Sequence, residues 1–211
     1  ARALKHGRFQ DIGVVMSNTA TFGNARILDS MWPTRPMTIF SHHPDHAHGA
    51  ERTLSAAIDR MQRQPVDGVI VVLEERISDF VGYKPPREFP VVLICESAAD
   101  HCPTVDADQY GCSTAIVDYL MSKGHNAVYH IAGPSTSRAA ESRARGWREA
   151  LEQMGARVPS MYIGDWCADS GYQPAWRWPT TPTARPSSRQ RPNAYGAMLG
   201  LQSAGKRVPE D

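Results

Sequence analysis

The sequence predicts an α/β fold in which parallel strands alternate with helices. Four short apolar runs, rich in valine and isoleucine, are typical of buried strands: residues 11–16, 66–73, 90–95 and 127–131. Amphipathic segments lie between these runs, and such alternation indicates parallel βαβ units. The chain has 211 residues, which is enough for one large domain or two small lobes.

In the first half of the chain, a polar loop at 18–24 follows the first strand, and residues 25–31 form the start of a helix. A second helix, 51–63, places four apolar side chains on one face: Leu54, Ala57, Ile58 and Met61. Gln64-Pro65 ends this helix, because proline cannot continue it. The strands at 66–73 and 90–95 follow.

In the second half, the segment 105–111 leads into a helix that packs four apolar side chains: Ile116, Val117, Leu120 and Met121. Gly124 suits the left-handed end of this helix. The strand at 127–131 ends at Gly133-Pro134, and the hydroxyls of 135–137 are available to cap the next helix. That helix, 139–154, has its apolar residues at spacings of three and four: Ala144, Trp147, Leu151 and Met154.

Two stretches break the pattern. Residues 32–48 contain three prolines and four histidines, which contradict a regular helix. Residues 174–193 contain five prolines and four arginines, a composition that by itself predicts disorder. We hypothesise that both stretches are read in a shifted frame, with genuine irregular loops as the alternative. The coding DNA would decide between these two explanations.

Composition narrows the class of protein. A net charge of +1 gives no sign of a polyanion-binding surface. Cys95, Cys102, Cys112 and Cys167 form no CxxC pair, and the sequence begins with no signal peptide, which predicts reduced thiols in a cytoplasmic protein. No apolar run approaches the ~20 residues of a membrane helix. The sequence contains no nucleophile elbow, Walker loop or GxGxxG motif, so we expect no enzyme and no cofactor.

A histidine cluster in the first irregular stretch has the density of a metal site: His42, His43, His46 and His48. No acidic or cysteine partner stands at a ligand spacing from it, so we expect no bound metal.

Several motifs resemble one family. Residues 124–134 read GHNAVYHIAGP, Arg143 stands one turn before Trp147, and residues 164–173 contain GDW followed by SGYQ. A further Pro-x-Asp-Gly-Val-Ile motif occupies 65–70. These features resemble the ligand-sensing core of the lac-repressor and galactose-repressor (LacI/GalR) family of bacterial transcription regulators. The resemblance extends over residues 1–173.

The resemblance implies a two-lobed fold like that of type I periplasmic binding proteins. Residues 1–8 would end a hinge helix, 9–107 would form the first lobe, and 108–211 the second. The DNA-binding headpiece of the family would precede Ala1. In the family the segment 208–211 leads into a further strand, so we expect a truncated second lobe and a marginally stable chain.

The resemblance also implies ligand contacts. Arg143 would hold the ligand in the cleft, and its guanidinium fork suits vicinal hydroxyls or a carboxylate. A surface position on an arginine-rich helix is the alternative. Trp166 would stack on the apolar face of a sugar, or it would be a core residue between the lobes.

Four further candidates follow from the resemblance. Phe22 and Asn24 lie where relatives place pocket walls, although Phe22 could equally anchor its loop. Cys95 replaces an acidic ligand-binding residue of relatives, so either Glu96 substitutes for it or the contact is lost. Asp108 could face the cleft, although capping the following helix is the favoured role. The family's Asn-Asp pair is replaced by Arg191-Pro-Asn193, so we expect that contact to be missing.

The function implied is effector sensing by a transcription regulator. A small effector, expected to be a sugar, would bind between the lobes, and a homodimer would pass the change to operator DNA through the headpiece. One alternative is a transport-associated sugar-binding protein of the same fold. Another is a damaged fragment that binds nothing.

Overall fold

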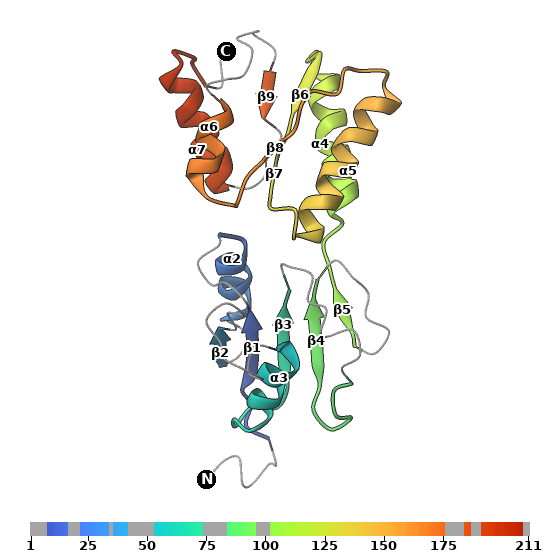
Figure 1. Ribbon diagram of the computed structural model, residues 1–211. Helices are drawn as coiled ribbons and strands as arrows, with labels where there is room; N and C mark the ends of the chain where they lie inside the picture. The colour runs from blue at the N-terminus through green and yellow to red at the C-terminus, as the bar shows by residue number, and fades with distance from the viewer. Residues whose placement is uncertain are drawn as a thin grey trace. The chain divides into compact units, whose positions relative to one another are not determined.

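The computed structural model describes residues 8–16, 22–33, 36–41, 53–73, 84–95, 102–175, 184–186 and 191–208. The chain divides into two compact units, residues 1–107 and 108–211. Each unit contains parallel strands with helices packed on both faces (Figure 1). The α/β fold class with parallel strands is therefore confirmed.

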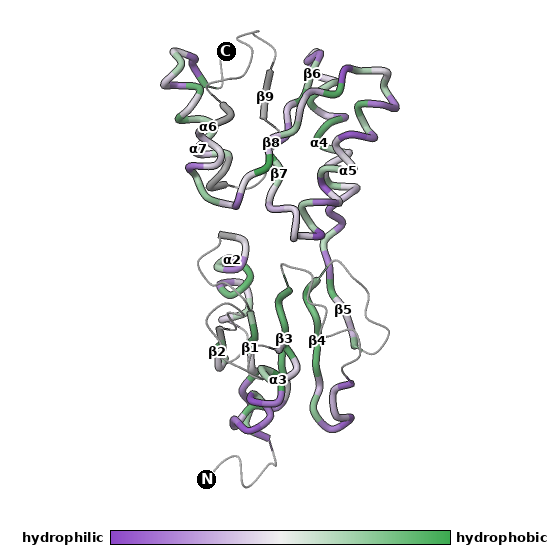
Figure 2. The backbone as a smooth tube through the Cα atoms, viewed as in Figure 1, coloured by the Kyte–Doolittle hydropathy of each residue, from purple (hydrophilic) through white to green (hydrophobic). Residues whose placement is uncertain are grey.

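The first unit is built on one parallel sheet with the strand order β2-β1-β3-β4-β5. Its strands are β1 (Ile12–Met16), β2 (Met37–Ser41), β3 (Val69–Val72), β4 (Val91–Ile94) and β5 (Thr104–Val105). The interior strands β3 and β4 are apolar along their length (Figure 2). Continuous apolar runs are expected of strands that are covered on both faces.

Two described helices cover opposite faces of this sheet. Helix α3 (Leu54–Gln62) packs its predicted apolar face against a cluster that includes Val15, and all four predicted residues are buried. Helix α2 (Phe22–Met31) packs against the cluster that includes Val14 and Met16. Successive residues of a strand point to opposite faces, so β1 contributes to two separate cores.

Strand β2 corrects the sequence analysis. The stretch 32–48 breaks the sequence pattern and was thought to be either read in a shifted frame or an irregular loop, yet Met37–Ser41 pairs in parallel with β1 along five residues. Pro36 directly precedes the strand, where it removes no hydrogen bond of the strand's own and its carbonyl accepts one from the Ile12 N–H at 3.2 Å. Prolines placed before a strand do not prevent it. The four histidines of this stretch lie outside the described residues.

The chain enters the first unit through a hydrogen-bonded clamp. Asp67 accepts the backbone N–H groups of Phe9 and Gln10, each at 2.7 Å from one of its two carboxylate oxygens. Gln10 has a φ of 61°, a left-handed conformation that is uncommon for a residue other than glycine. The clamp therefore holds a strained entry point in place. Residues 1–7 of the predicted hinge helix lie outside the described residues.

The second unit has its strands in two parallel pairs, β6 with β9 and β7 with β8. Its strands are β6 (Ala127–Tyr129), β7 (Ile131–Ala132), β8 (Tyr162–Ile163) and β9 (Ala184–Pro186). The helices are α4 (Gln109–Ser122), α5 (Arg138–Gln153), α6 (Ala168–Ala175) and α7 (Arg191–Ser203). The single strand predicted at 127–131 is thus divided at His130.

Helices cover both faces of β6 and β7. Val128 joins Trp147 and Leu151 in a core with α4 and α5, which lie side by side. Tyr129 and Ile131 pack instead against α7. Helices α6 and α7 approach closely, because a Cβ at Gly196 would lie 1.8 Å from the carbonyl oxygen of Ala168. The second unit is therefore layered like the first.

The helix ends follow the sequence closely. Ser137 caps α5 by accepting the Ala140 N–H at 3.3 Å, and Gly124 has a φ of 87° just after α4. The predicted helix 139–154 included Met154 in its apolar face, but α5 ends at Gln153 and Met154 is 44% exposed. Among the described residues, no helix is long and apolar enough to cross a membrane.

The disorder that composition suggested for 174–193 is wrong at the described segments of that stretch, the first of which, 174–175, ends α6. Residues 184–186 form β9, which pairs with β6, and α7 begins at Arg191. Pro192 stands in the first turn of α7, where its missing N–H has no intrahelical partner to lose. Proline disrupts a helix or a strand only at particular positions, so the proline content of a stretch does not by itself show whether the stretch is ordered.

Candidate functional site

The second unit brings the two foremost candidate residues together. Arg143 lies in the second turn of α5, and Trp166 lies between β8 and α6. The guanidinium carbon of Arg143 is 5.3 Å from the centroid of the Trp166 ring, within the range of a cation–π contact. Two residues 23 positions apart thus form one site at the carboxyl ends of β7 and β8, where α/β folds bind their ligands.

The backbone of Trp166 is strained. Its φ is 72°, a left-handed value that is rare for a bulky residue and persists only when its surroundings enforce it. The neighbours supply that constraint: Asp165 accepts the Cys167 N–H at 2.9 Å, and the Ser170 hydroxyl accepts the Asp165 N–H at 3.2 Å. A side-chain hydrogen bond from Ser170 to the Asp165 carboxyl, and secondly the Cys167 N–H, hold the pKa of Asp165 below its usual value. Strain of this kind is concentrated at functional sites.

Gly133 provides the surface against which the indole ring of Trp166 packs. A Cβ at this position would lie 1.9 Å from Cη2 and 2.2 and 2.3 Å from the two ring carbons bonded to it. Because the three distances are so similar, such an atom would sit over the ring face and not beyond its edge. The glycine after β7 is therefore required for the close approach of the tryptophan.

Arg143 is held from two directions by the start of α4. Its Nη1 donates to Oε1 of Gln109, and its carbonyl oxygen accepts the Ser113 hydroxyl at 2.8 Å. The side chain is half-buried. The alternative of a purely surface arginine on an arginine-rich helix does not describe this position, because α4 and Trp166 both contact the side chain.

His130 belongs to the same neighbourhood, and the sequence analysis missed it. The ring is 4% exposed and stacks on Trp147, with 5.4 Å between ring centroids and 24° between planes. Burial, and secondly the positive charge of Arg143, lower its pKa to about 4. The imidazole is therefore neutral near pH 7. A histidine inside an apolar strand segment was the available signal in the sequence.

Asp108 has a structural role. Its Oδ1 accepts the Gly111 N–H at 2.7 Å and caps α4, which is the role that the sequence favoured. Asp108 directly precedes Gln109, the residue whose side chain accepts a hydrogen bond from Arg143.

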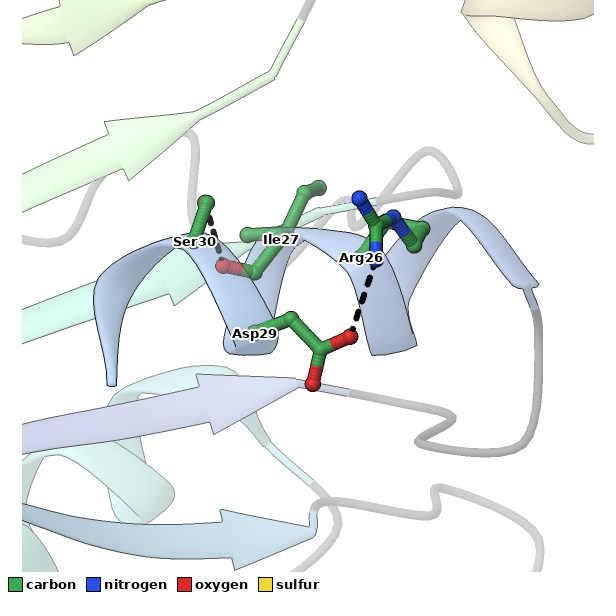
Figure 3. Close-up of polar contacts among 4 residues, drawn as sticks. All are labelled: Arg26, Ile27, Asp29 and Ser30. Carbon is green, nitrogen blue, oxygen red and sulfur yellow. Dashed lines mark hydrogen bonds and ion pairs between the residues drawn. The ribbon is translucent and has the colours of Figure 1, made fainter. Parts of the chain in front are cut away.

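Asn24 is not in a loop, which corrects the sequence analysis. Helix α2 already begins at Phe22, and the Asn24 side chain is 2% exposed within the helix. The solvent side of α2 carries an ion pair between Arg26 and Asp29 at 3.2 Å (Figure 3). The Phe22 side chain lies outside the described residues.

Cys95 is a core residue in this structure. Its side chain is 9% exposed and packs in the same apolar cluster as Cys102. Burial, and secondly the Cys95 thiol, raise the pKa of Cys102. None of the described cysteines forms a disulfide. Glu96 and Asn193 do not have described side chains, so the contacts considered for them stay untested.

A separate cavity of about 520 Å³ lies beside α5. Its walls include the segment Gly133–Ser135, Arg145 and Arg148 of α5, and Ile163 of β8, but neither Arg143 nor Trp166. We place the candidate site at Arg143 and Trp166 because strain, contact and charge converge there. Among the described residues, no group of three histidine, cysteine or acidic side chains could hold a metal ion.

Comparison with known proteins identifies the family. The family model of periplasmic binding proteins and the sugar-binding domain of the LacI family matches residues 45–173. That match covers more than half of the chain, and the chain belongs to this family. The resemblance seen in the sequence is thereby confirmed.

Three relatives are transcriptional repressors. The lactose operon repressor of Klebsiella pneumoniae is 33% identical over 57% of the chain and 34% of the repressor. The repressor CytR of Escherichia coli K12 is 28% identical over 79% of the chain and 49% of its own length. The repressor PurR of Escherichia coli O139:H28 is 25% identical over the whole chain and 64% of its length. The chain thus spans from a third to just under two thirds of these relatives.

Solved structures show the same fold. The lac repressor dimer bound to operator and the anti-inducer ONPF superposes with a TM-score of 0.78 at 21% identity, over 98% of this chain and 74% of that one. The Escherichia coli repressor AscG gives a TM-score of 0.72 at 20% identity, over 95% and 76%. The periplasmic-binding-protein-like fold predicted from the sequence is confirmed.

Proposed function

We propose that this chain is the effector-sensing part of a bacterial LacI-type transcription regulator and binds a small effector, of the sugar class, through Arg143 and Trp166. The contact between these two side chains at 5.3 Å carries the proposal. The repressor relatives support the regulatory role. We propose no catalytic activity and a cytoplasmic location.

The chemistry of the pair suits a sugar. A guanidinium offers five N–H donors in a fixed fork, which can bind hydroxyl or carboxylate oxygens. An indole offers an apolar face for the C–H face of a pyranose. Because the Arg143 guanidinium contacts the indole ring, a sugar bound beside Trp166 would have its oxygens near the guanidinium. Contacts from the first unit, and closure of two lobes around the effector, stay predictions from the resemblance.

A thermal-shift and calorimetry screen against mono- and disaccharides tests the site. We expect at least one sugar to raise the melting temperature, and Arg143→Ala to weaken its binding by about tenfold to a hundredfold, since hydrogen bonds to charged groups contribute roughly 1.5–3 kcal/mol. Arg148→Ala is the matched control, because Arg148 is exposed on the same helix. It should bind like the wild type.

Two results of the screen would contradict the proposal. If a sugar binds equally well to wild type and Arg143→Ala, the site lies elsewhere. If no sugar changes a cooperative melting transition, the effector is not a sugar or the chain is a fragment without binding activity. A transport-associated sugar-binding protein would share the response to sugar. If the same gene also encodes a DNA-binding segment upstream of this chain, that alternative is excluded.

We also propose that the regulator is a homodimer that reaches operator DNA through a headpiece outside this chain. An exposed apolar stripe on α7 supports self-association: Tyr195, Met198 and Leu199 are 58%, 40% and 38% exposed at spacings of three and four. Monomeric proteins rarely leave such a stripe uncovered.

Sedimentation velocity tests the α7 stripe. We expect Met198→Asp to shift the chain from dimer to monomer, because a carboxylate cannot be buried there without a partner. Tyr119→Asp is the control, since Tyr119 is 61% exposed on α4, and it should leave the assembly unchanged. A wild-type chain that sediments as a monomer at tens of micromolar would refute this part of the proposal.

A further inference from the structure

We propose that Gln109 is a positioning residue, which holds the Arg143 guanidinium in the orientation that receives the effector. Gln109 is the first residue of α4, and its Oε1 accepts a hydrogen bond from Nη1 of Arg143 on α5. The role assigned to the held guanidinium rests on the proposed function. The holding itself is a property of these two side chains and can be measured without an effector.

The start of α4 is a firm support for this bond. Asp108 caps the helix through the Gly111 N–H at 2.7 Å, which fixes the backbone on either side of Gln109. One turn later, the Ser113 hydroxyl donates to the carbonyl oxygen of Arg143 at 2.8 Å. A single turn of α4 therefore holds both the main chain and the side chain of Arg143.

The two helices cannot slide apart without losing these bonds. A Cβ at Gly146 would lie 2.6 Å from the carbonyl oxygen of Tyr110, so the helix backbones are in close approach beside the site. The Tyr110 hydroxyl also donates to Glu149 at 2.6 Å, one turn further along α5. The distance between Gln109 and Arg143 is thus set by packing and not by the flexibility of either side chain.

The Gln109 amide can position the Arg143 guanidinium without neutralising its charge. A guanidinium has five N–H donors and no acceptor, and a bond to an amide oxygen occupies one of these donors without balancing the positive charge. A carboxylate at position 109 would hold the guanidinium more tightly and would also balance its charge. An alanine at position 109 would keep the contact between Arg143 and the Trp166 ring but would remove the hydrogen bond between α4 and the Arg143 side chain. The wild type and the two variants at position 109 are therefore expected to differ in the mobility of Arg143.

The test measures the rate at which phenylglyoxal modifies Arg143 in the full chain, by mass spectrometry of peptides. We expect Gln109→Ala to raise this rate by roughly three- to tenfold, in line with the loss of one hydrogen bond. Gln109→Glu should lower the rate below that of the wild type. Arg148, exposed on the same helix, is the internal reference in every sample and should react at a constant rate.

An Arg143 rate within twofold of wild type in Gln109→Ala, with Arg148 unchanged, would overturn the proposal. If Gln109→Ala accelerates both arginines, the variant has loosened the fold, and Gln109→Glu then decides: a rate equal to or above the wild type overturns the proposal. Because no sugar is present, failure here leaves the effector proposal intact. A failed sugar screen likewise leaves the positioning of Arg143 untouched.

Discussion

Replacement of Trp147 by alanine is expected to lower the free energy of unfolding of the second unit by about 3–5 kcal/mol, the usual cost of removing a buried aromatic side chain. Trp147 is completely buried between α5 and β6. Its Nε1 donates to the Val128 carbonyl at 2.8 Å, and its ring stacks on His130. The variant loses apolar contacts and leaves a buried carbonyl without its donor.

Urea denaturation followed by circular dichroism measures this loss. Trp32→Ala is the matched control, because the Trp32 side chain is 64% exposed after α2. Its unfolding free energy should change by less than about 1 kcal/mol. Similar losses in the two variants would show that Trp147 is not the centre of the second core.

Acid is expected to destabilise the second unit through His130. The imidazole has a pKa of about 4 in the folded chain and about 6.5 when exposed. Below pH 6.5 the unfolded chain binds a proton that the folded chain does not, so stability is complete above pH 6.5 and falls as the pH approaches 4. The difference in pKa corresponds to a loss of about 3 kcal/mol over that range.

Unfolding free energies of the wild type and His130→Gln, compared at pH 7, 5.5 and 4.5, isolate this contribution. Glutamine does not titrate, so the variant should lose less stability between pH 7 and 4.5 than the wild type does. Arg143→Ala should also flatten the dependence, since Arg143 is the second cause of the lowered pKa. Parallel curves for wild type and His130→Gln would contradict the assignment.

The elements that could be predicted from the sequence are those that carry a local signal. Ser137 precedes and caps a helix, Gly124 follows the end of one, and β3 is a continuous run of apolar β-branched residues. Strands β2 and β9 carry a weaker local signal, because each is a short segment inside a proline-rich stretch; their pairing, Met37 with Ile12 and Ala184 with Ala127, becomes visible only in the structure. Proline-rich surroundings concealed both strands.

The site shows the same division. The resemblance pointed to Arg143 and Trp166 separately, but their contact depends on Gly133, whose missing side chain admits the indole ring. The bond from Gln109 joins positions 34 residues apart, so no spacing rule could reveal it. Asn24 was misplaced because Gly23 and Asn24 are typical of a loop, whereas α2 begins at Phe22.

The clamp at Asp67 has a mechanical consequence. The Asp67 carboxylate accepts two successive backbone N–H groups, those of Phe9 and Gln10. These two residues are therefore fixed to the turn that precedes β3. Any displacement of that turn would carry residues 9 and 10 with it, although Asp67 lies 57 positions after Gln10 in the sequence.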